Sequence, residues 1–143
     1  ATAVDTELML DLKGPRKRLA ERVLCAIEPY FGERRFTVCA RWWRLLEAFA
    51  GTPVRRVYSI RNERQLRSGL RRFASQAVEG ASIHERLADR ETVGALGEIA
   101  DVVMVWPVNE AAREPALLGL GVAGLITDDV AAMSRAVALG PTT

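Results

Sequence analysis

Two ionisable side chains near the start of the chain have types and a spacing that suit a polar site. Asp11 and Lys13 lie two positions apart in the run LMLDLK, at residues 8–13. Because side chains alternate between the two faces of a strand, a strand here points both groups to the same side. Burying a carboxylate and an ammonium group costs free energy unless the two charges are paired or bind other groups. The spacing leaves two interpretations open: an active-site pair at a strand end, or a mutual or external ion pair.

The single histidine and one of the three tryptophans also end predicted strands. His84, in ASIHERL, is either a polar residue at a strand terminus or a supporting contact at a site mouth, since histidine titrates near neutral pH. Trp106 closes the apolar run DVVMVWPV, where an indole ring can pack in the core or wall a pocket. Pro107 favours ending that strand near Trp106, because proline is tolerated only at strand ends and edges.

Length and composition indicate one ordinary globular domain. The chain has 143 residues, of which 49% are hydrophobic and 27% charged, with a net charge of +2. One domain spanning residues 1–143 is the expectation. A charge this small does not favour nucleic acid or a membrane as a partner.

Arginine is locally dense between Arg55 and Arg72, where seven arginines stand against one acid, Glu63. Single-stranded nucleic-acid sites usually add stacking aromatics, and only Tyr58 and Phe73 lie near. We therefore predict a solvated helix face.

The cysteines and the hydropathy pattern indicate the cellular compartment of the protein. Cys25 and Cys39 lie in apolar surroundings without a Cys-x-x-Cys partner, so both are predicted to be buried free thiols in a reducing compartment. No apolar run approaches the ~20 residues of a spanning helix, and no signal peptide is visible. A cytoplasmic protein is the expectation.

Strand and helix patterns alternate along the chain. Two apolar stripes have helical or nearly helical spacing, and each needs a sheet to cover: Leu19–Val23–Leu24–Ile27–Phe31 and Trp42–Leu45–Leu46–Phe49. Trp42 and Trp43 are expected to pack their helix against that sheet. The predicted strands are residues 8–13, 36–40, 54–60, 81–85, 101–108 and 123–128.

Helix boundaries support this division. Asn62 and Gln65 form a predicted capping box, and Asp89 and Asp128 are predicted N-caps, Asp128 following Thr127 at a strand end. The predicted helix ends are at Gly32, Gly51 and Gly121.

The fold class that follows is α/β with parallel strands, since alternating strands and helices form βα units. About six strands fit either a doubly wound open sheet or part of an eight-stranded barrel. No Gly-x-Gly-x-x-Gly follows a strand, which counts against a dinucleotide-binding sheet.

The segment VWPVNEAAREPALLGLGVAGLITDD, at residues 105–129, predicts a strand, a turn, a helix with a glycine at its end, and a second strand. It resembles the closing segment of the glycerophosphodiester phosphodiesterase family, in which a Trp-x-Val-Asn strand end precedes a Gly-Val-x-Gly-x-Ile-Thr-Asp strand. The matching residues are Trp106, Val108, Asn109, Gly121, Val122, Gly124, Ile126, Thr127 and Asp128.

The resemblance runs from Leu10 to about Met133 and implies a parallel (β/α) barrel of TIM type. It covers the family's later portion, so about six βα units are expected, and the first two strands are expected to be missing. The chain begins without Met, just ahead of an apparent core strand, so a fragment or a processed product is expected.

The resemblance also implies roles for individual residues. The family has an acidic-x-Lys pair at the strand of Asp11 and Lys13, normally Glu-x-Lys, so Asp11 would bind a divalent cation, Ca²⁺ or Mg²⁺, and Lys13 would contact the substrate phosphate. The aspartate that stands here in place of the family's glutamate shortens the reach of the carboxylate by one methylene. By the same resemblance Trp106 lines the pocket beside the substrate alcohol, and Asn109 closes the following loop.

Two weaker candidates follow other strands. Arg41 stands where the family often has a Ser-Phe or Ser-Arg pair facing the mouth, and its guanidinium could fork onto phosphate. Ser59, near the next strand's end, is a fainter candidate. His84 remains a weak substrate-binding candidate.

The chain also departs from the family. The catalytic His-Arg-Gly motif, the second histidine and the further acids of the metal site do not occur in it, and the family's proline after Asp128 is absent.

Two functions are therefore expected as alternatives. One is metal-dependent hydrolysis of glycerophosphodiesters, with a small-molecule substrate. The other is a catalytically silent barrel remnant that acts as a binding or assembly module. A barrel without two strands would expose sheet edges and apolar positions, which predicts self-association or a second chain that completes the sheet.

Overall fold

The computed structural model describes residues 6–139 of the chain. The chain divides into two compact units, the first ending at Ser59 and the second beginning at Ile60. The expectation of a single domain remains a prediction, and each unit is described by itself.

The strands predicted from the sequence are confirmed, but those predicted at 101–108 and 123–128 are shorter, at Val103–Trp106 and Gly124–Leu125. Every strand pair within a unit is parallel, and consecutive strands are neighbours: β1 with β2 and β3 in the first unit, β4 with β5 and β6 in the second. The α/β class with parallel strands is therefore confirmed. The strands in the described part of the chain are β1 (Leu8–Leu12), β2 (Phe36–Ala40), β3 (Arg55–Ile60), β4 (Gly80–His84), β5 (Val103–Trp106) and β6 (Gly124–Leu125).

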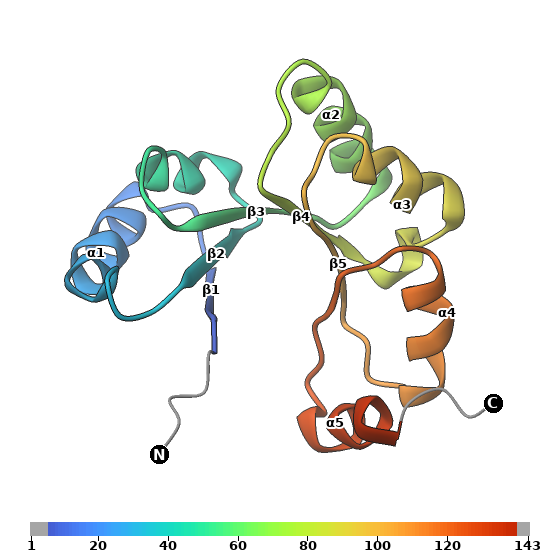
Figure 1. The fold of residues 1–143 in the computed structure, drawn as a ribbon. Coiled ribbons are helices and arrows are strands. Elements are labelled where there is room, and N and C mark those ends of the chain that lie inside the picture. Colours follow the sequence, from blue (N-terminus) through green and yellow to red (C-terminus); the bar gives the residue numbers. More distant parts are fainter. Residues whose placement is uncertain (1–5, 140–143) are drawn as a thin grey trace. The chain divides into compact units, whose positions relative to one another are not determined.

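Helices connect the strands (Figure 1). In the first unit, the apolar stripe of α1 is confirmed in part, since Ile27 is buried while Leu19, Val23 and Leu24 are half-buried. The helices of the first unit are α1 (Lys17–Ile27) and the 3₁₀ helices η1 (Glu28–Tyr30) and η2 (Trp43–Phe49). Those of the second unit are α2 (Glu63–Phe73), η3 (Glu85–Leu87), α3 (Arg90–Gly97), η4 (Ala111–Arg113), α4 (Glu114–Gly119) and α5 (Val130–Leu139).

The stripe from Trp42 to Phe49 forms the 3₁₀ helix η2 and not the expected α-helix. Three residues per turn align Leu46 with Phe49, and both side chains are fully buried. Trp42 lies ahead of this turn with 54% of its surface exposed, so its predicted packing is wrong. Trp43 does pack inward, because its ring meets Tyr58 edge-on at 5.9 Å between centroids.

The two cysteines differ in burial. Cys39 is buried in β2, as predicted, but Cys25 is exposed, so that prediction is wrong. The reason is helical geometry: Cys25 precedes the buried Ile27 by two residues, which is about 200° around α1.

Strand β1 is less buried than a core strand. Its pattern leaves only Leu12 buried, while Leu8 and Met9 are each more than one third exposed. Among the described residues, the strand partner of β1 is β2.

The second unit confirms two predicted caps. Asn62 Oδ1 accepts a hydrogen bond from the amide of Gln65 at 3.0 Å, and Gln65 Oε1 accepts one from the amide of Arg61 at 2.8 Å. Asp89 Oδ1 accepts from the amide of Thr92 at 2.7 Å, at the start of α3. Side-chain oxygens thus satisfy backbone donors that no helical turn reaches.

The arginine-rich stretch has two parts. Arg64, Arg67 and Arg71 lie exposed on α2, which confirms the predicted solvated helix face. Arg55 and Arg56 belong to β3 and are partly buried. Within residues 6–139, no helix has the length and apolar character needed to cross a membrane.

Removing the Asn62 cap should destabilise the second unit. Asn62→Ala deletes the acceptor for the Gln65 amide, so we expect a loss of about 1 kcal/mol in the free energy of unfolding, measured by urea denaturation. Asn62→Asp keeps a side-chain acceptor and serves as the control. Equal unfolding midpoints for the alanine variant and the parent would contradict the assignment of this cap.

Candidate functional site

Asp11 and Lys13 point to the same side of β1, as their spacing predicts. Lys13 Nζ donates a hydrogen bond to Asp11 Oδ2, so the two groups form a mutual ion pair. The Asp11 side chain is 49% exposed and that of Lys13 73% exposed. An ion pair this exposed adds little to stability, so both groups remain available to ligands.

The Asp11 carboxylate is a hard oxygen donor of the kind that Ca²⁺ and Mg²⁺ prefer. Oδ2 accepts from Lys13, and a carboxylate retains further lone pairs for a cation. Among residues 6–139, no three His, Cys, Asp or Glu side chains are grouped so that they could hold a metal ion. The described residues therefore fit one ligand of such a site and not a complete one.

Two other predicted residues of the first unit differ in exposure. Arg41 is exposed and follows the last residue of β2, just as Lys13 follows the end of β1. Because Leu12 pairs with Ala40, both cations leave the sheet at its carboxyl edge. Ser59 is buried, and its backbone oxygen accepts from Trp43 Nε1 at 2.9 Å, while the predicted role of its hydroxyl remains a prediction.

In the second unit the structure brings His84 and Trp106 together. They are the last residues of β4 and β5 and are partners in the strand register. Their rings meet nearly edge-on, with 4.9 Å between centroids and 69° between planes. The sequence placed both residues at strand ends but did not predict this contact.

The hydrogen bonding of His84 favours its neutral form. Nδ1 accepts from the amide of Arg86 at 3.2 Å, so the proton of the neutral ring belongs on Nε2. Desolvation by burial lowers the pKa of His84, and the positive charges of Arg86 and Arg61 lower it further, while Glu85 opposes them. At neutral pH His84 can therefore donate a hydrogen bond from Nε2.

Trp106 carries a buried polar atom without a partner. Its Nε1 is shielded from solvent and makes no hydrogen bond within the described part of the chain. Buried donors are nearly always paired, so an orphan one is available to an acceptor on a ligand or a water. The following bond to Pro107 is cis, and β5 ends at Trp106, as the proline predicted.

Asn109 joins the loops that follow β5 and β6. Its Oδ1 accepts from Thr127 Oγ1 at 3.1 Å and from the amide of Asp128 at 2.9 Å. Its Nδ2 donates to Asp128 Oδ2 at 3.3 Å. Asn109 thus closes its loop, and its predicted contact with a substrate remains a prediction.

The cap of α5 is not where the sequence analysis placed it. Asp129, and not Asp128, caps the helix, since its Oδ1 accepts from the amide of Ala132 at 2.9 Å. Asp128 is held instead by Asn109. Both residues are aspartates, so only the long-range contact decides between them.

One ion pair near His84 was not predicted. Arg113 Nη1 donates to Glu85 Oε2, which links η4 to η3. The two residues are far apart in sequence. The only local signal is that Glu85 directly follows His84, which is itself a substrate-binding candidate.

Comparisons with known proteins give matches in structure only. No protein-family model matches the chain, and no curated protein matches it. A candidate glycerophosphoryl diester phosphodiesterase from Silicibacter pomeroyi superposes with a TM-score of 0.76 at 20% identity, covering 95% of this chain and 52% of that one.

Two further solved structures are similar to the chain. A phosphodiesterase from Oleispira antarctica, in complex with the product sn-glycerol-3-phosphate, has a TM-score of 0.71 and 17% identity over 94% of this chain and 56% of its own. A candidate glycerophosphodiester phosphodiesterase from Galdieria sulphuraria has a TM-score of 0.71 and 19% identity over 95% and 59%.

These likenesses establish the fold. The predicted class, parallel βα units of an incomplete (β/α) barrel, is confirmed, and so is the resemblance to glycerophosphodiester phosphodiesterases at the level of fold. The chain spans a little over half the length of the structures it matches.

The titration of His84 tests the local electrostatics. Because the chain has one histidine, its ring protons give one signal set, and we expect NMR to report a pKa below the ordinary value of about 6.5. Arg86→Gln should raise the pKa and Glu85→Gln should lower it, while Arg90→Gln serves as the control. A pKa at or above the ordinary value would contradict the described environment.

Proposed function

We propose that this chain is part of a metal-dependent phosphodiesterase that hydrolyses glycerophosphodiesters. The observation that carries the proposal is its likeness in fold, over about 95% of its length, to solved phosphodiesterases, one of them bound to sn-glycerol-3-phosphate. The residues at the carboxyl ends of its strands support it, because active sites of parallel barrels lie at that end.

In this proposal the ion pair on β1 meets the phosphate. Lys13 Nζ would offset the charge of the phosphate oxygens, and a mostly exposed ammonium group can move from Asp11 to a phosphate at little cost. Arg41, exposed beyond β2, would add a second cation able to bind phosphate through two N–H groups.

Asp11 would serve as one ligand of a divalent cation, Ca²⁺ or Mg²⁺. When bound, such a cation polarises a phosphoryl oxygen and orients the substrate. The remaining ligands would come from outside the described residues, in which no three candidate ligands gather.

The cluster at the ends of β4 and β5 would receive the alcohol part of the substrate. Trp106 offers an apolar ring and a buried indole N–H without a partner, which suits a group that is apolar on one side and carries an oxygen. In His84, Nδ1 is occupied by the amide of Arg86, so this side chain would donate from Nε2 and not accept a proton. In this proposal a residue other than His84 therefore acts as the general base.

Hydrolysis of glycerophosphocholine by the full-length protein tests the proposal. We expect turnover that a chelator abolishes and that Lys13→Ala lowers by about a hundredfold, because a phosphate-binding charge would be lost. Asp11→Ala should lower it similarly and raise the cation concentration required. Lys17→Ala and Asp101→Ala remove exposed charges of the same kinds and serve as matched controls.

Turnover that is insensitive to chelator, or unchanged in Asp11→Ala, would contradict the metal site. A full-length protein that folds but turns over no glycerophosphodiester would favour the alternative, a binding or assembly module.

A further inference from the structure

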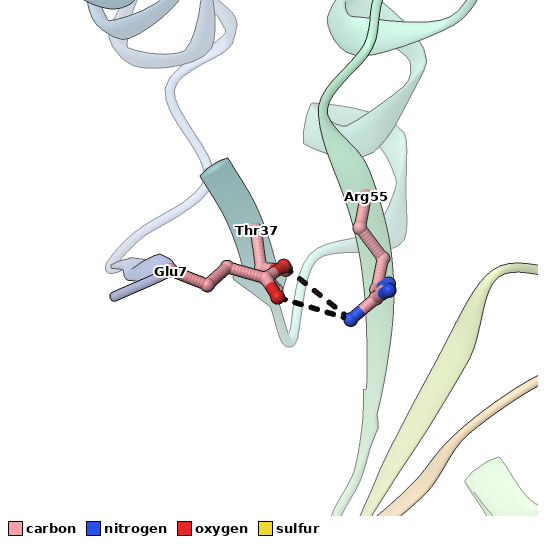
Figure 2. A network of polar contacts seen from close by, with 3 residues as sticks. All are labelled: Glu7, Thr37 and Arg55. Carbon is pink, nitrogen blue, oxygen red and sulfur yellow. Dashed lines mark hydrogen bonds and ion pairs between the residues drawn. The ribbon is translucent and has the colours of Figure 1, made fainter. Parts of the chain in front are cut away.

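Three side chains form a polar network at the amino ends of the strands of the first unit (Figure 2). Arg55 Nη1 donates to both carboxylate oxygens of Glu7, at 3.3 Å each, and Thr37 Oγ1 donates to Glu7 Oε1. The network thus connects β3 and β2 with the residue that precedes β1. We call these three residues the Glu7 network.

The strand that the network holds has little apolar burial of its own. Only Leu12 of β1 is buried, and Leu8 and Met9 are substantially exposed. A slip by one residue turns every side chain of a strand to the opposite face. A polar contact that forms in one register only can therefore act with the apolar residues of β1 to select that register.

The Glu7 network is sensitive to register. Met9, Thr37 and Arg55 are partners across the three strands, so Glu7 lies on the same face, two residues earlier. A slip by two residues keeps the face but shifts the carboxylate by about 6–7 Å, beyond hydrogen-bond reach. Thr37 is only 2% exposed, so its hydroxyl would then lose its carboxylate acceptor in a buried position.

Asp11 and Lys13 follow Glu7 on the same face of the same strand. A slip that moves Glu7 moves both groups by an equal distance along the sheet. We propose that the Glu7 network fixes the register of β1 and thereby makes Glu7, Thr37 and Arg55 positioning residues for Asp11 and Lys13. The effect of the network on the register of β1 does not depend on which reaction the protein catalyses. Its effect on turnover rests on the proposed phosphodiesterase function.

Hydrogen exchange of the full-length protein tests whether the Glu7 network holds β1 in place. Thr37→Val removes the hydroxyl at nearly constant shape, and Thr37→Ser retains it. We expect amides of residues 8–12 to exchange at least about tenfold faster in Thr37→Val and in Glu7→Gln, since a strand that has lost these contacts opens more often. Thr37→Ser should match the parent, Glu21→Gln is the matched control for the lost charge, and α2 should exchange at the parent rate.

Kinetics then separate positioning from stability. Thr37→Val should lower kcat/KM for glycerophosphocholine by roughly tenfold to a hundredfold at a temperature where circular dichroism shows it folded, and Thr37→Ser should restore it. Unchanged exchange in residues 8–12 overturns the role of the network. Faster exchange with unchanged kcat/KM overturns the positioning role. A parent protein without turnover, in which exchange still responds, overturns the proposed function and leaves the register role standing.

Discussion

The constraint on which the structure depends is the common direction of its parallel strands. In each unit, strands that run in the same direction end at one edge of the sheet, so residues at strand ends become neighbours. This places Lys13 and Arg41 beyond the ends of β1 and β2, and it makes His84 the register partner of Trp106. The helices return the chain and bury the apolar face that holds these strands.

The two groups of candidate residues are held in different ways. In the first unit the Asp11–Lys13 pair is exposed, so its position depends on the register of β1 and, in our proposal, on the Glu7 network. In the second unit the rings of His84 and Trp106 pack together, and Asn109 fastens the next two loops. The buried indole N–H of Trp106 is the one described side-chain donor found shielded and without a partner, so it is available to an acceptor on a ligand or a water.

Local patterns predicted much of this, and long-range contacts account for the rest. The period of two gave the common face of Asp11 and Lys13, and capping chemistry gave Asn62. The sequence could not choose between adjacent aspartates for the cap of α5, because Asn109 makes that choice from another loop. The Glu7 network and the Glu85–Arg113 pair join residues that no local pattern relates. Exposure of Cys25 and Trp42 likewise depends on which side of a helix or turn meets the sheet.

The most direct measurement is a crystal structure of the full-length protein with Ca²⁺ and sn-glycerol-3-phosphate. The account predicts an Asp11 carboxylate oxygen on the cation and Lys13 Nζ within hydrogen-bond distance of a phosphate oxygen, with the mutual ion pair loosened. A complex in which cation and phosphate bind elsewhere, while Asp11 and Lys13 remain paired only with each other, would contradict it.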